Sequence, residues 1–312
     1  MRRTWVVTGC YGFLGKHVVR HLLEQGEDVW GIDAETYAHS PIPWGTGGWN
    51  PTDRWHYQHA DIADLDWLPD CDLVVNCAAE THVDNSIGDA SPFLRSNVVG
   101  TQRLIELVRG KASYRMPVLL QVSTDEVYGS THRGFVEPNA PLAPRNPYAA
   151  SKAASDLLVR AAQITHDVPA RILRMTNLYG VWQYPEKLIP KTVRYLARGK
   201  TVPVHGDGSA IRSWLLVQDA ARAIWEVGTK GVNGGIYHAN GNTEAAVIEV
   251  VRRIAQLLDV AHAAEPGFTR PGLDQRYALA DQPTRDLGWH PMGDFWVDLP
   301  GLVEMERARA PW

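Results

Sequence analysis

The 312-residue sequence contains few cysteines, namely Cys10, Cys71 and Cys77. Their spacing fits neither a zinc site nor a disulfide framework, so we expect no bound metal and no disulfide bonds. A small, odd number of cysteines is typical of proteins in reducing compartments, which predicts a cytoplasmic location.

Long apolar runs and an excess of charge of one sign are also lacking. No apolar run approaches the ~18 residues that a membrane-spanning helix needs. The start, Met1-Arg2-Arg3 before Trp5-Val6-Val7, resembles a signal peptide only briefly, because glycines and Lys16 soon interrupt the apolar segment. The formal net charge is −4 and no long basic run occurs, so we expect neither a membrane nor a nucleic-acid partner.

The N-terminus carries a dinucleotide-binding pattern. A predicted strand over residues 4–8 leads into three glycines, a predicted helix over residues 16–25 and a second strand over residues 29–32. Such glycines allow a tight turn, close approach of backbone N–H groups to a pyrophosphate, and close packing of helix on strand. Their G-x-x-G-x-x-G spacing is that of the short-chain dehydrogenase type of site, formed here by Gly9, Gly12, Phe13, Leu14 and Gly15.

Asp33 follows the second predicted strand, 18 residues after Gly15. At this distance its carboxylate is placed to bond the adenosine ribose hydroxyls, and it repels a 2′-phosphate, so NAD is favoured over NADP. Residues 37–54, rich in Pro, Gly and Trp, are expected to form a loop near the adenine. The ends of two later strands complete the expected NAD site with Asp61, Ile62, Ala78 and Ala79.

The chemistry is expected at the segment from Ser123 to Gly129, which follows an apolar strand over residues 117–122. This segment places the Thr124 hydroxyl beside two adjacent carboxylates, Asp125 and Glu126. The alternative is that Ser123-x-x-Glu126 is a capping box, which merely begins a helix whose dipole favours acids in its first turn.

Tyr148 and Lys152 have i, i+4 spacing, which places both on one face of a helix. There the ammonium group is expected to lower the phenol pKa, so that Tyr148 serves as a base toward a substrate hydroxyl and Lys152 holds the nicotinamide ribose. Both motifs follow strands of a doubly wound pattern, in which ligands bind at the carboxyl ends of the strands. The predicted fold is α/β, a Rossmann-type parallel sheet with a smaller C-terminal cap.

The chain resembles the extended short-chain dehydrogenase/reductase family, and within it the nucleoside-diphosphate-glucose 4,6-dehydratases of the dTDP-glucose 4,6-dehydratase type. The discriminating part is Thr124-Asp125-Glu126, because relatives that epimerise or decarboxylate sugar nucleotides tend to have other residues at the acidic pair. The matching segments run almost end to end: Thr8 to Gly15, Ala78 to Asp84, Ser86-Ile87, Ser123 to Gly129, Tyr148 to Lys152, Asn177, Tyr179-Gly180, Pro185 to Pro190, Gly206 to Gly208, Arg212, Trp214 and Arg270 to Gly272.

The resemblance implies a redox-neutral reaction in three stages, with NAD retained as a prosthetic group. Tyr148 takes the proton of the sugar 4-hydroxyl, assisted by Thr124, as C4 is oxidised. Glu126 then removes the C5 proton while Asp125 protonates the departing 6-hydroxyl. Hydride returns to C6 and a proton returns to C5. The two carboxyls must therefore differ in protonation state, which burial and like-charge proximity can achieve.

The resemblance also implies the substrate contacts and the assembly. The nucleoside diphosphate would contact Ser86, Asn177, Lys187, Leu188, Pro203, His205, Arg212 and Arg270. Departures from the family occur at His205, Ser213, Thr243 or Asn242, and Leu273, around the expected base and ribose pocket, so thymidine, uridine or another base stays open. In relatives, helices corresponding to residues 93–109 and 148–166 pair into a four-helix bundle, which predicts a homodimer.

We expect residues 1–180 to form the NAD-binding domain and residues 181–312 the smaller nucleotide-sugar-binding domain, with some exchange of chain between them. Residues 173–177 are expected to be the last strand of the sheet. After it we expect helices over residues 188–198, 217–227, 246–258 and 299–308, with a hairpin-like stretch at residues 202–205.

Two polar residues have alternative roles. Asn97 lies inside the predicted helix over residues 93–109, where it either bridges to the catalytic strands or faces solvent. His82 is expected to be structural, because no partner His or Cys has metal-ligand spacing.

Two other functions remain alternatives. A sugar-nucleotide 4-epimerase or decarboxylase of the same fold needs Tyr148 and Lys152 but not the Asp125–Glu126 pair. A non-catalytic NAD-binding sensor or scaffold belongs to another class, and the joint presence of Thr124 and these four residues argues against it.

Overall fold

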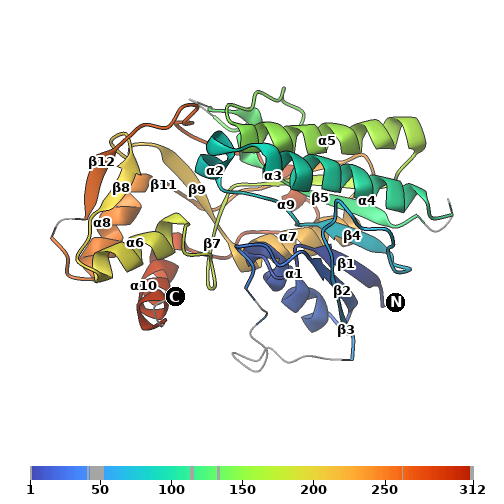
Figure 1. Cartoon of the computed structure of the whole chain (residues 1–312), viewed down its shortest axis with the longest axis horizontal. Coiled ribbons are helices and arrows are strands. Elements are labelled where there is room, and N and C mark those ends of the chain that lie inside the picture. The colour runs from blue at the N-terminus through green and yellow to red at the C-terminus, as the bar shows by residue number, and fades with distance from the viewer. Residues whose placement is uncertain are drawn as a thin grey trace.

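The computed structural model describes residues 2–40, 42, 53–112, 116–131, 134–261 and 263–309. At its centre is a seven-stranded parallel sheet with the order β3-β2-β1-β4-β5-β6-β10 (Figure 1). This order confirms the predicted Rossmann-type fold. The strands are β1 (Thr4–Thr8), β2 (Asp28–Asp33), β3 (Trp55–His59), β4 (Leu73–Asn76), β5 (Val118–Thr124), β6 (Ala170–Met175) and β10 (Ile236–Ala239).

Helices cover both faces of this sheet (Figure 1). Successive strand residues point to opposite faces, so Val7 and Val75 pack with α1 (Phe13–Glu24) and α7 (Val217–Lys230). Val6 and Val74 belong to a second core with α4 (Gly100–Arg109) and α5 (Pro147–His166). Because both faces are buried, the strands are apolar along nearly their whole length.

A smaller lobe lies beside the carboxyl edge of the sheet (Figure 1). It contains two small sheets, one with the order β11-β9-β7 and one pairing β12 with β8. Its elements are β7 (Asn177–Tyr179), α6 (Leu188–Ala197), β8 (Val202–His205), β9 (Ile211–Leu216), β11 (Thr243–Ala246), α8 (Val247–Leu257), β12 (Ala264–Gly267) and α10 (Phe295–Ala308). Its own apolar core includes Tyr179, Trp214 and Phe295.

Two strand predictions in the second half of the chain were wrong. The segment at residues 202–205 is β8, which pairs in parallel with β12, so it is not part of a hairpin. The large sheet does not end at residue 177, because β10 pairs in parallel with β6 as a seventh strand. Residues after 180 therefore contribute to the larger sheet.

The predicted helix over residues 93–109 is continuous but irregular. It begins as α3 (Ser91–Phe93), widens into the π-helical turn η1 (Leu94–Val99) and continues as α4. Asn97 lies in the π turn and is buried. Its amide group donates to Ser151 Oγ at 2.8 Å and to the Glu80 carbonyl at 3.0 Å, and its oxygen accepts from the Glu80 N–H at 2.9 Å. Asn97 therefore bridges the end of β4 to α5 and does not face solvent.

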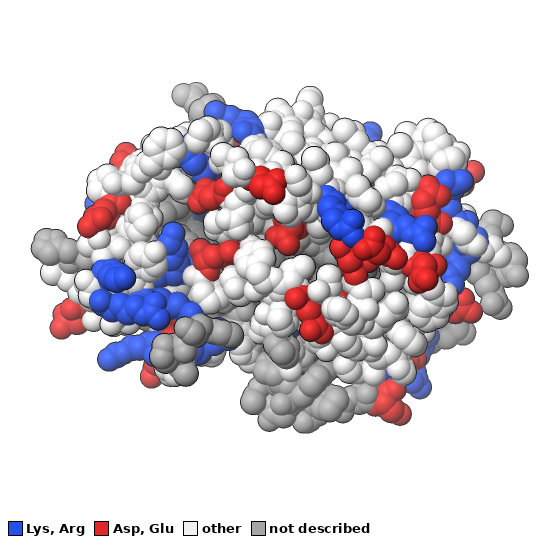
Figure 2. Space-filling model, viewed as in Figure 1, with Lys and Arg blue, Asp and Glu red and all other residues white. Residues whose placement is uncertain are grey.

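Several surface features bear on the sequence predictions. Within the described ranges, no helix has the length and apolar character that crossing a membrane requires. On the face shown in Figure 2, Lys and Arg side chains are interspersed with Asp and Glu. The expected loop over residues 37–54 lies largely outside the described residues, which include only its two ends. His82 caps α2 (Val83–Gly88) by accepting the Asn85 N–H at 3.3 Å, which is a structural role.

Candidate active site

The glycine turn after β1 forms a cradle that side chains would fill. A Cβ on Gly15 would lie 2.0 Å from the Gly9 carbonyl oxygen, and Gly9 itself has φ +66° and faces the Ala78 backbone. Helix α1 begins directly after Gly12, which provides no side-chain cap, so N–H groups of the first turn remain available. A helix N-terminus with free N–H groups is suited to a pyrophosphate, and this geometry fits NAD.

Two adjoining cavities extend from this turn along the carboxyl ends of the strands. The first, of about 230 Å³, is lined by Asp33, Asp61, Ile62 and Ala78, among others. The second, of about 290 Å³, is lined by Phe13, Leu14, Gly15 and the predicted catalytic residues. The cavities share Gly9, Gly12, Ala38, Cys77 and Ala79, so they form one continuous groove from the predicted adenosine end at Asp33 to the predicted catalytic residues.

Asp33 lies at the adenosine end of this groove, at the end of β2. One carboxylate oxygen accepts the Tyr11 N–H at 2.8 Å and the other accepts the Glu35 N–H at 2.7 Å. These backbone donors hold the carboxylate in place beside the cavity. The predicted NAD-binding residues are thus brought together from the turn after β1, the ends of β2, β3 and β4, and the start of α5.

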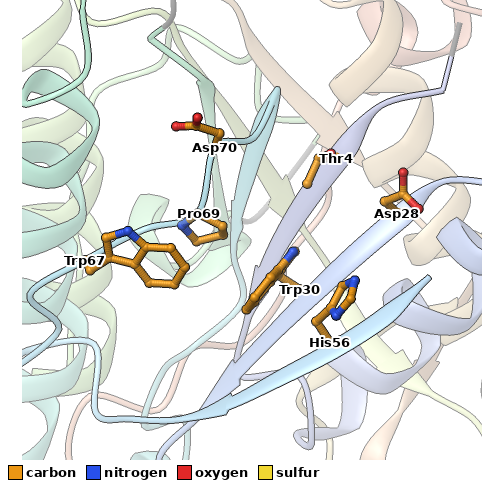
Figure 3. Close-up of a pocket in the computed structure, with 7 residues that line it drawn as sticks. All are labelled: Thr4, Asp28, Trp30, His56, Trp67, Pro69 and Asp70. Atoms are coloured by element: carbon orange, nitrogen blue, oxygen red, sulfur yellow. The ribbon is translucent and has the colours of Figure 1, made fainter. Parts of the chain in front are cut away.

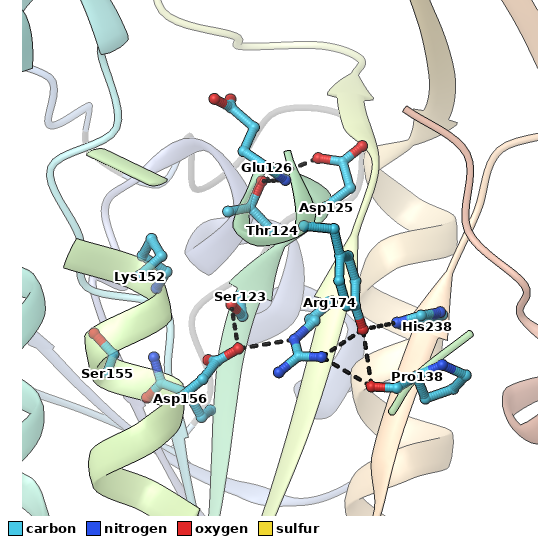
Figure 4. A network of polar contacts seen from close by, with 12 residues as sticks. Ser123, Thr124, Asp125, Glu126, Pro138, Lys152, Ser155, Asp156, Arg174 and His238 are labelled. Atoms are coloured by element: carbon cyan, nitrogen blue, oxygen red, sulfur yellow. Dashed lines mark hydrogen bonds and ion pairs between the residues drawn. The ribbon is translucent and has the colours of Figure 1, made fainter. Parts of the chain in front are cut away.

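The predicted catalytic segment forms a single 3₁₀ turn, η3 (Asp125–Tyr128), at the end of β5. Thr124 caps it by accepting the Glu126 N–H at 3.3 Å, whereas the Ser123 hydroxyl donates to Asp156 at 3.0 Å. The capping box with Ser123 as cap is therefore wrong, although a turn does begin here. Successive residues of a 3₁₀ helix point about 120° apart, and Figure 4 shows Asp125 and Glu126 diverging.

The two carboxyl groups have different environments. Asp125 is 3% exposed; its Oδ1 accepts from Thr124 Oγ1 at 3.1 Å, and its Oδ2 is buried without a hydrogen-bond partner. Burial, and then the nearby Glu126, raise the pKa of Asp125 to about 8. Burial also raises the pKa of Glu126, but a hydrogen bond from Asn146 and the charges of Arg270 and Arg212 oppose that rise.

Tyr148 and Lys152 line the same cavity from the first turns of α5. Lys152 Nζ donates to the Val122 carbonyl at 2.7 Å. Burial, followed by the charges of Glu126, Asp125 and Asp156, raises the pKa of Tyr148, and a hydrogen bond with Thr124 acts in the opposite direction. The expected lowering of the phenol pKa by Lys152 is therefore outweighed in this environment, chiefly by burial of the hydroxyl.

A buried polar network lies directly beneath the catalytic turn (Figure 4). Arg174 on β6 donates from Nε to Asp156 Oδ2 at 2.8 Å, and both side chains are at most 1% exposed. Arg174 Nη1 donates to Tyr128 Oη. His238 Nδ1 lies 2.9 Å from the Ala280 carbonyl and must donate to it, so Nε2 accepts the Tyr128 hydroxyl at 2.7 Å. The network ties η3 to α5, β6 and β10.

We expect Arg174→Met to destabilise the fold by about 3–5 kcal/mol, because it leaves the Asp156 carboxylate buried and without its counter-ion. Urea denaturation measures the free energy of unfolding. Arg109→Met is the matched control: Arg109 pairs with Glu106 at 3.0 Å on the surface, where such a pair contributes ~0–1 kcal/mol. Equal effects of the two substitutions would contradict a structural role for the buried pair.

The predicted diphosphate contacts lie around the junction of the two lobes, where Arg270 and His205 both pair with Asp84. Asp84 Oδ1 lies 3.1 Å from Arg270 Nη1, and Asp84 Oδ2 lies 3.4 Å from His205 Nε2. Arg212 is stacked over the Tyr277 ring, 4.6 Å from its centroid, and donates to the Asp274 carbonyl at 3.1 Å. None of these three residues lines the groove, and their contact with a substrate stays a prediction.

Of the remaining predicted substrate residues, some line the cavity with the predicted catalytic residues and others lie elsewhere. Asn177 and Lys187 line the catalytic cavity, and Lys187 Nζ donates to Thr81 Oγ1 at 3.2 Å. Leu188 begins α6, and Pro203 is exposed on β8. Ser86 is buried: its hydroxyl donates to the Val83 carbonyl at 2.6 Å and accepts the Tyr148 N–H at 3.2 Å, so it anchors the start of α5.

The sequence reasoning missed Asn146, Asp156, Arg174 and His238. Asn146 carried a usable signal, because Asn directly before Pro147 is typical of a helix N-cap followed by proline at the first helical position. The other three contact each other or η3 across long sequence separations, which no local pattern reveals.

A larger, open cavity of about 680 Å³ lies away from this site (Figure 3). It is formed at the amino ends of β1, β2 and β3, with Trp30, His56 and Trp67 among its lining residues. Doubly wound sheets bind ligands at the carboxyl ends of their strands, so size alone does not identify the site.

Comparisons with known proteins agree with the prediction that this groove binds NAD. Residues 5–239 match the model of the NAD dependent epimerase/dehydratase family. The low-salt glycan biosynthesis protein Agl12 of Haloferax volcanii is 41% identical, over 96% of this chain and 97% of its own length. A dTDP-glucose 4,6-dehydratase of Neisseria gonorrhoeae is 39% identical, over 97% and 95%. DesIV, a dTDP-glucose 4,6-dehydratase of Streptomyces venezuelae solved with NAD and TYD bound, has a TM-score of 0.91 and 37% identity, covering 97% of each chain.

Proposed function

Because the chain belongs to the NAD dependent epimerase/dehydratase family, we propose that it converts a nucleoside-diphosphate glucose, dTDP- or UDP-glucose, to the 4-keto-6-deoxy sugar nucleotide. The observation that carries this proposal is the Asp125–Glu126 pair on η3, which lines the same cavity as Tyr148 and Lys152. An epimerase has no use for a proton donor and a proton acceptor side by side at this point.

When bound, NAD would supply the hydride chemistry, namely the oxidation at C4 and the later reduction at C6. The glycine turn, Asp33 and Lys152 would hold it. Tyr148 is the base that takes the proton of the 4-hydroxyl, and Thr124, which is hydrogen-bonded to Tyr148, orients the same oxygen. Tyr148 must be ionised to accept this proton, and the positive charge of oxidised NAD would favour the ionised phenol when the cofactor is bound.

The elimination belongs to the two carboxyl groups. Glu126 removes the C5 proton, which the 4-ketone makes acidic, and a proton returns to C5 when C6 is reduced. Asp125, protonated at neutral pH because its pKa is about 8, gives its proton to the 6-hydroxyl as water leaves. Its partnerless Oδ2 atom is the group available to the substrate. The divergence of the two side chains suits reaction at two adjacent carbon atoms.

Incubation with dTDP-, UDP-, CDP- and GDP-glucose, followed by mass spectrometry, tests the proposal. We expect loss of one water from the sugar of dTDP-glucose or UDP-glucose, without net change in NAD. A 4-epimer of unchanged mass would support the epimerase alternative. Failure with every glucose nucleotide, in protein that retains NAD, would refute the proposed function and favour the non-catalytic one.

The proton donor sets the alkaline limit of the reaction. Asp125 must be protonated to act, so kcat/KM for dehydration is expected to fall as pH rises through about 8, tenfold for each further unit. Initial rates of product formation on both sides of this pH measure the effect. Asp125→Asn should lose most of the activity, and its residual activity should no longer fall above about pH 8. If the residual activity still falls as in the wild type, another group causes the alkaline decrease.

We also propose that the protein is a homodimer, joined through η1, α4 and α5. These helices lie side by side on one surface (Figure 1) and expose Leu94, Val99, Leu157 and Ile164 to between 51% and 79%. Leu157 and Ile164 are two turns apart on one face of α5, which suits a four-helix bundle.

Exchanging Leu157 and Ile164 together for Lys is expected to convert the dimer to a monomer, since two charges would be buried without partners at its centre. Light scattering measures the mass. Val232→Lys, at a site that is 66% exposed elsewhere on the surface, should leave the dimer intact. A monomeric wild-type protein would contradict the proposed assembly.

A further inference from the structure

Asn146 makes two hydrogen bonds that join a helix end to a carboxylate of the proposed site. It is 6% exposed and precedes the first residue of α5. Its Oδ1 accepts the Ala149 N–H at 2.8 Å, and its Nδ2 donates to Glu126 Oε2 at 3.0 Å. A backbone N–H can only donate, so the oxygen must face Ala149 and the amide group must face Glu126.

The helix requires only half of this side chain. Ser, Thr and Asp cap a helix about as well as Asn, because a cap needs only an oxygen acceptor. An N–H donor turned away from the helix contributes nothing to α5. An aspartate at this position has no donor, and a serine hydroxyl ends one bond short of the position of the Asn146 amide nitrogen. The helix does not require the amide N–H group of Asn146, whereas Glu126 accepts a hydrogen bond from it.

From this geometry we infer that Asn146 is a positioning residue, which orients Glu126 and keeps it ionised for removal of the C5 proton. The inference rests on the proposed dehydratase function. It names a residue outside the segment that carries the chemistry, and it links the start of the Tyr148 helix directly to the carboxylate on η3. The neighbours of the two carboxyl groups then favour different protonation states. Asn146 donates to Glu126 and favours its ionised form, whereas Asp125 Oδ2 has no donor among the described residues.

Other groups around Glu126 act in both directions. Arg270 and Arg212 approach from the segment after β12 and from β9 and lower its pKa, while Asp274 raises it. Asp125 on the same turn and Tyr148 on α5 are coupled to it electrostatically. Arg270 is paired with Asp84 and Arg212 donates to backbone carbonyls. Asn146 adds to these charges a directed bond at a fixed distance, which also sets the orientation of the carboxylate.

Two substitutions separate the cap from the donor. Asn146→Ser keeps an acceptor for the Ala149 N–H, but its hydroxyl, one bond shorter than the amide, does not reach Glu126. The rate constant kcat for dehydration should therefore fall about tenfold to hundredfold, the value of one hydrogen bond to a charged group. The acidic limb of kcat/KM should move up by about one pH unit or more. Asn146→Asp keeps the cap but opposes Glu126 with a second carboxylate, so the same limb should move further.

Single-turnover measurements distinguish positioning from damage to the fold. In Asn146→Ser, oxidation at C4 should keep its rate, and reduced NAD should accumulate because proton removal from C5 is slowed. Asp294→Ser is the matched control: it changes the cap of α10, whose Oδ1 accepts the Trp296 N–H at 3.0 Å, and should leave the pH profile unchanged. An unshifted acidic limb without reduced NAD in Asn146→Ser would overturn the inference.

A measurement without substrate tests the role of Asn146 independently of the proposed dehydratase activity. Carbon-13 NMR of labelled glutamate, assigned with Glu126→Gln, gives the pKa of Glu126 directly. The inference predicts a rise of about one unit in Asn146→Ser. If this rise occurs while the wild-type protein dehydrates no sugar nucleotide, the proposed function fails and the contact stands. If the wild type is active and the pKa does not move, the positioning role fails alone.

Discussion

Glu126→Gln is expected to oxidise its substrate and then stop. The amide cannot remove the C5 proton, so dehydration should slow by about 10²–10⁴-fold, the usual contribution of a general base. Oxidation at C4 depends on Tyr148, which the substitution leaves in place. Absorbance of enzyme-bound NADH, followed after mixing with dTDP-glucose, should therefore rise and persist, while the dehydrated product stays absent in mass spectrometry.

The substitution is close to isosteric, and the Asn146 amide can still donate to the glutamine oxygen. An unchanged melting temperature would therefore attribute the loss to chemistry. Full dehydratase turnover in this variant would show that another group removes the C5 proton and that the assignment of Glu126 is wrong.

Tyr148→Phe is expected to block the reaction one stage earlier. Without the hydroxyl no group at this position takes the proton of the 4-hydroxyl, so turnover should again fall by about 10²–10⁴-fold. Here, in contrast to Glu126→Gln, bound NADH should not accumulate. The opposite redox state of the retained cofactor in two almost equally inactive variants is a sharper test than either rate alone.

Tyr195→Phe is a suitable control, because Tyr195 belongs to α6 in the smaller lobe. It should retain both turnover and the ordinary cofactor spectrum. Accumulation of NADH in Tyr148→Phe at the wild-type rate would remove Tyr148 from the oxidation and would leave Lys152 or Thr124 to be examined in its place.

The N-terminal half of the fold was predictable because its signals are local. β1 ends at a glycine turn, α1 has a continuous apolar face, and Asp33 closes β2. β10 was missed because it is a four-residue edge strand, Ile236–Ala239, whose partner β6 lies far earlier in the chain. The parallel pairing of β8 with β12 was missed for the same reason. Packing decides which distant strands pair, and the sequence of a four-residue strand does not indicate its partner.

The proposed catalytic residues could be predicted as residue types, but their surroundings could not. Tyr148-x-x-x-Lys152 predicted a shared helix face correctly, yet not the carboxylates that dominate the surroundings of Tyr148. Likewise the adjacency of Asp125 and Glu126 was visible, whereas the partnerless oxygen of one and the amide donor to the other depend on α5. Contacts of this kind arise from chain segments that meet only after folding.

The π turn at Leu94–Val99 has a consequence for comparing this chain with its relatives. A π turn holds one residue more than the α-helix that it interrupts, and an extra residue rotates what precedes it by roughly 100°. A relative that lacks one residue here would turn its counterpart of Asn97 away from Glu80 and Ser151. An alignment gap within this turn therefore indicates a lost bridge between two segments of the active site, even where the asparagine itself is retained.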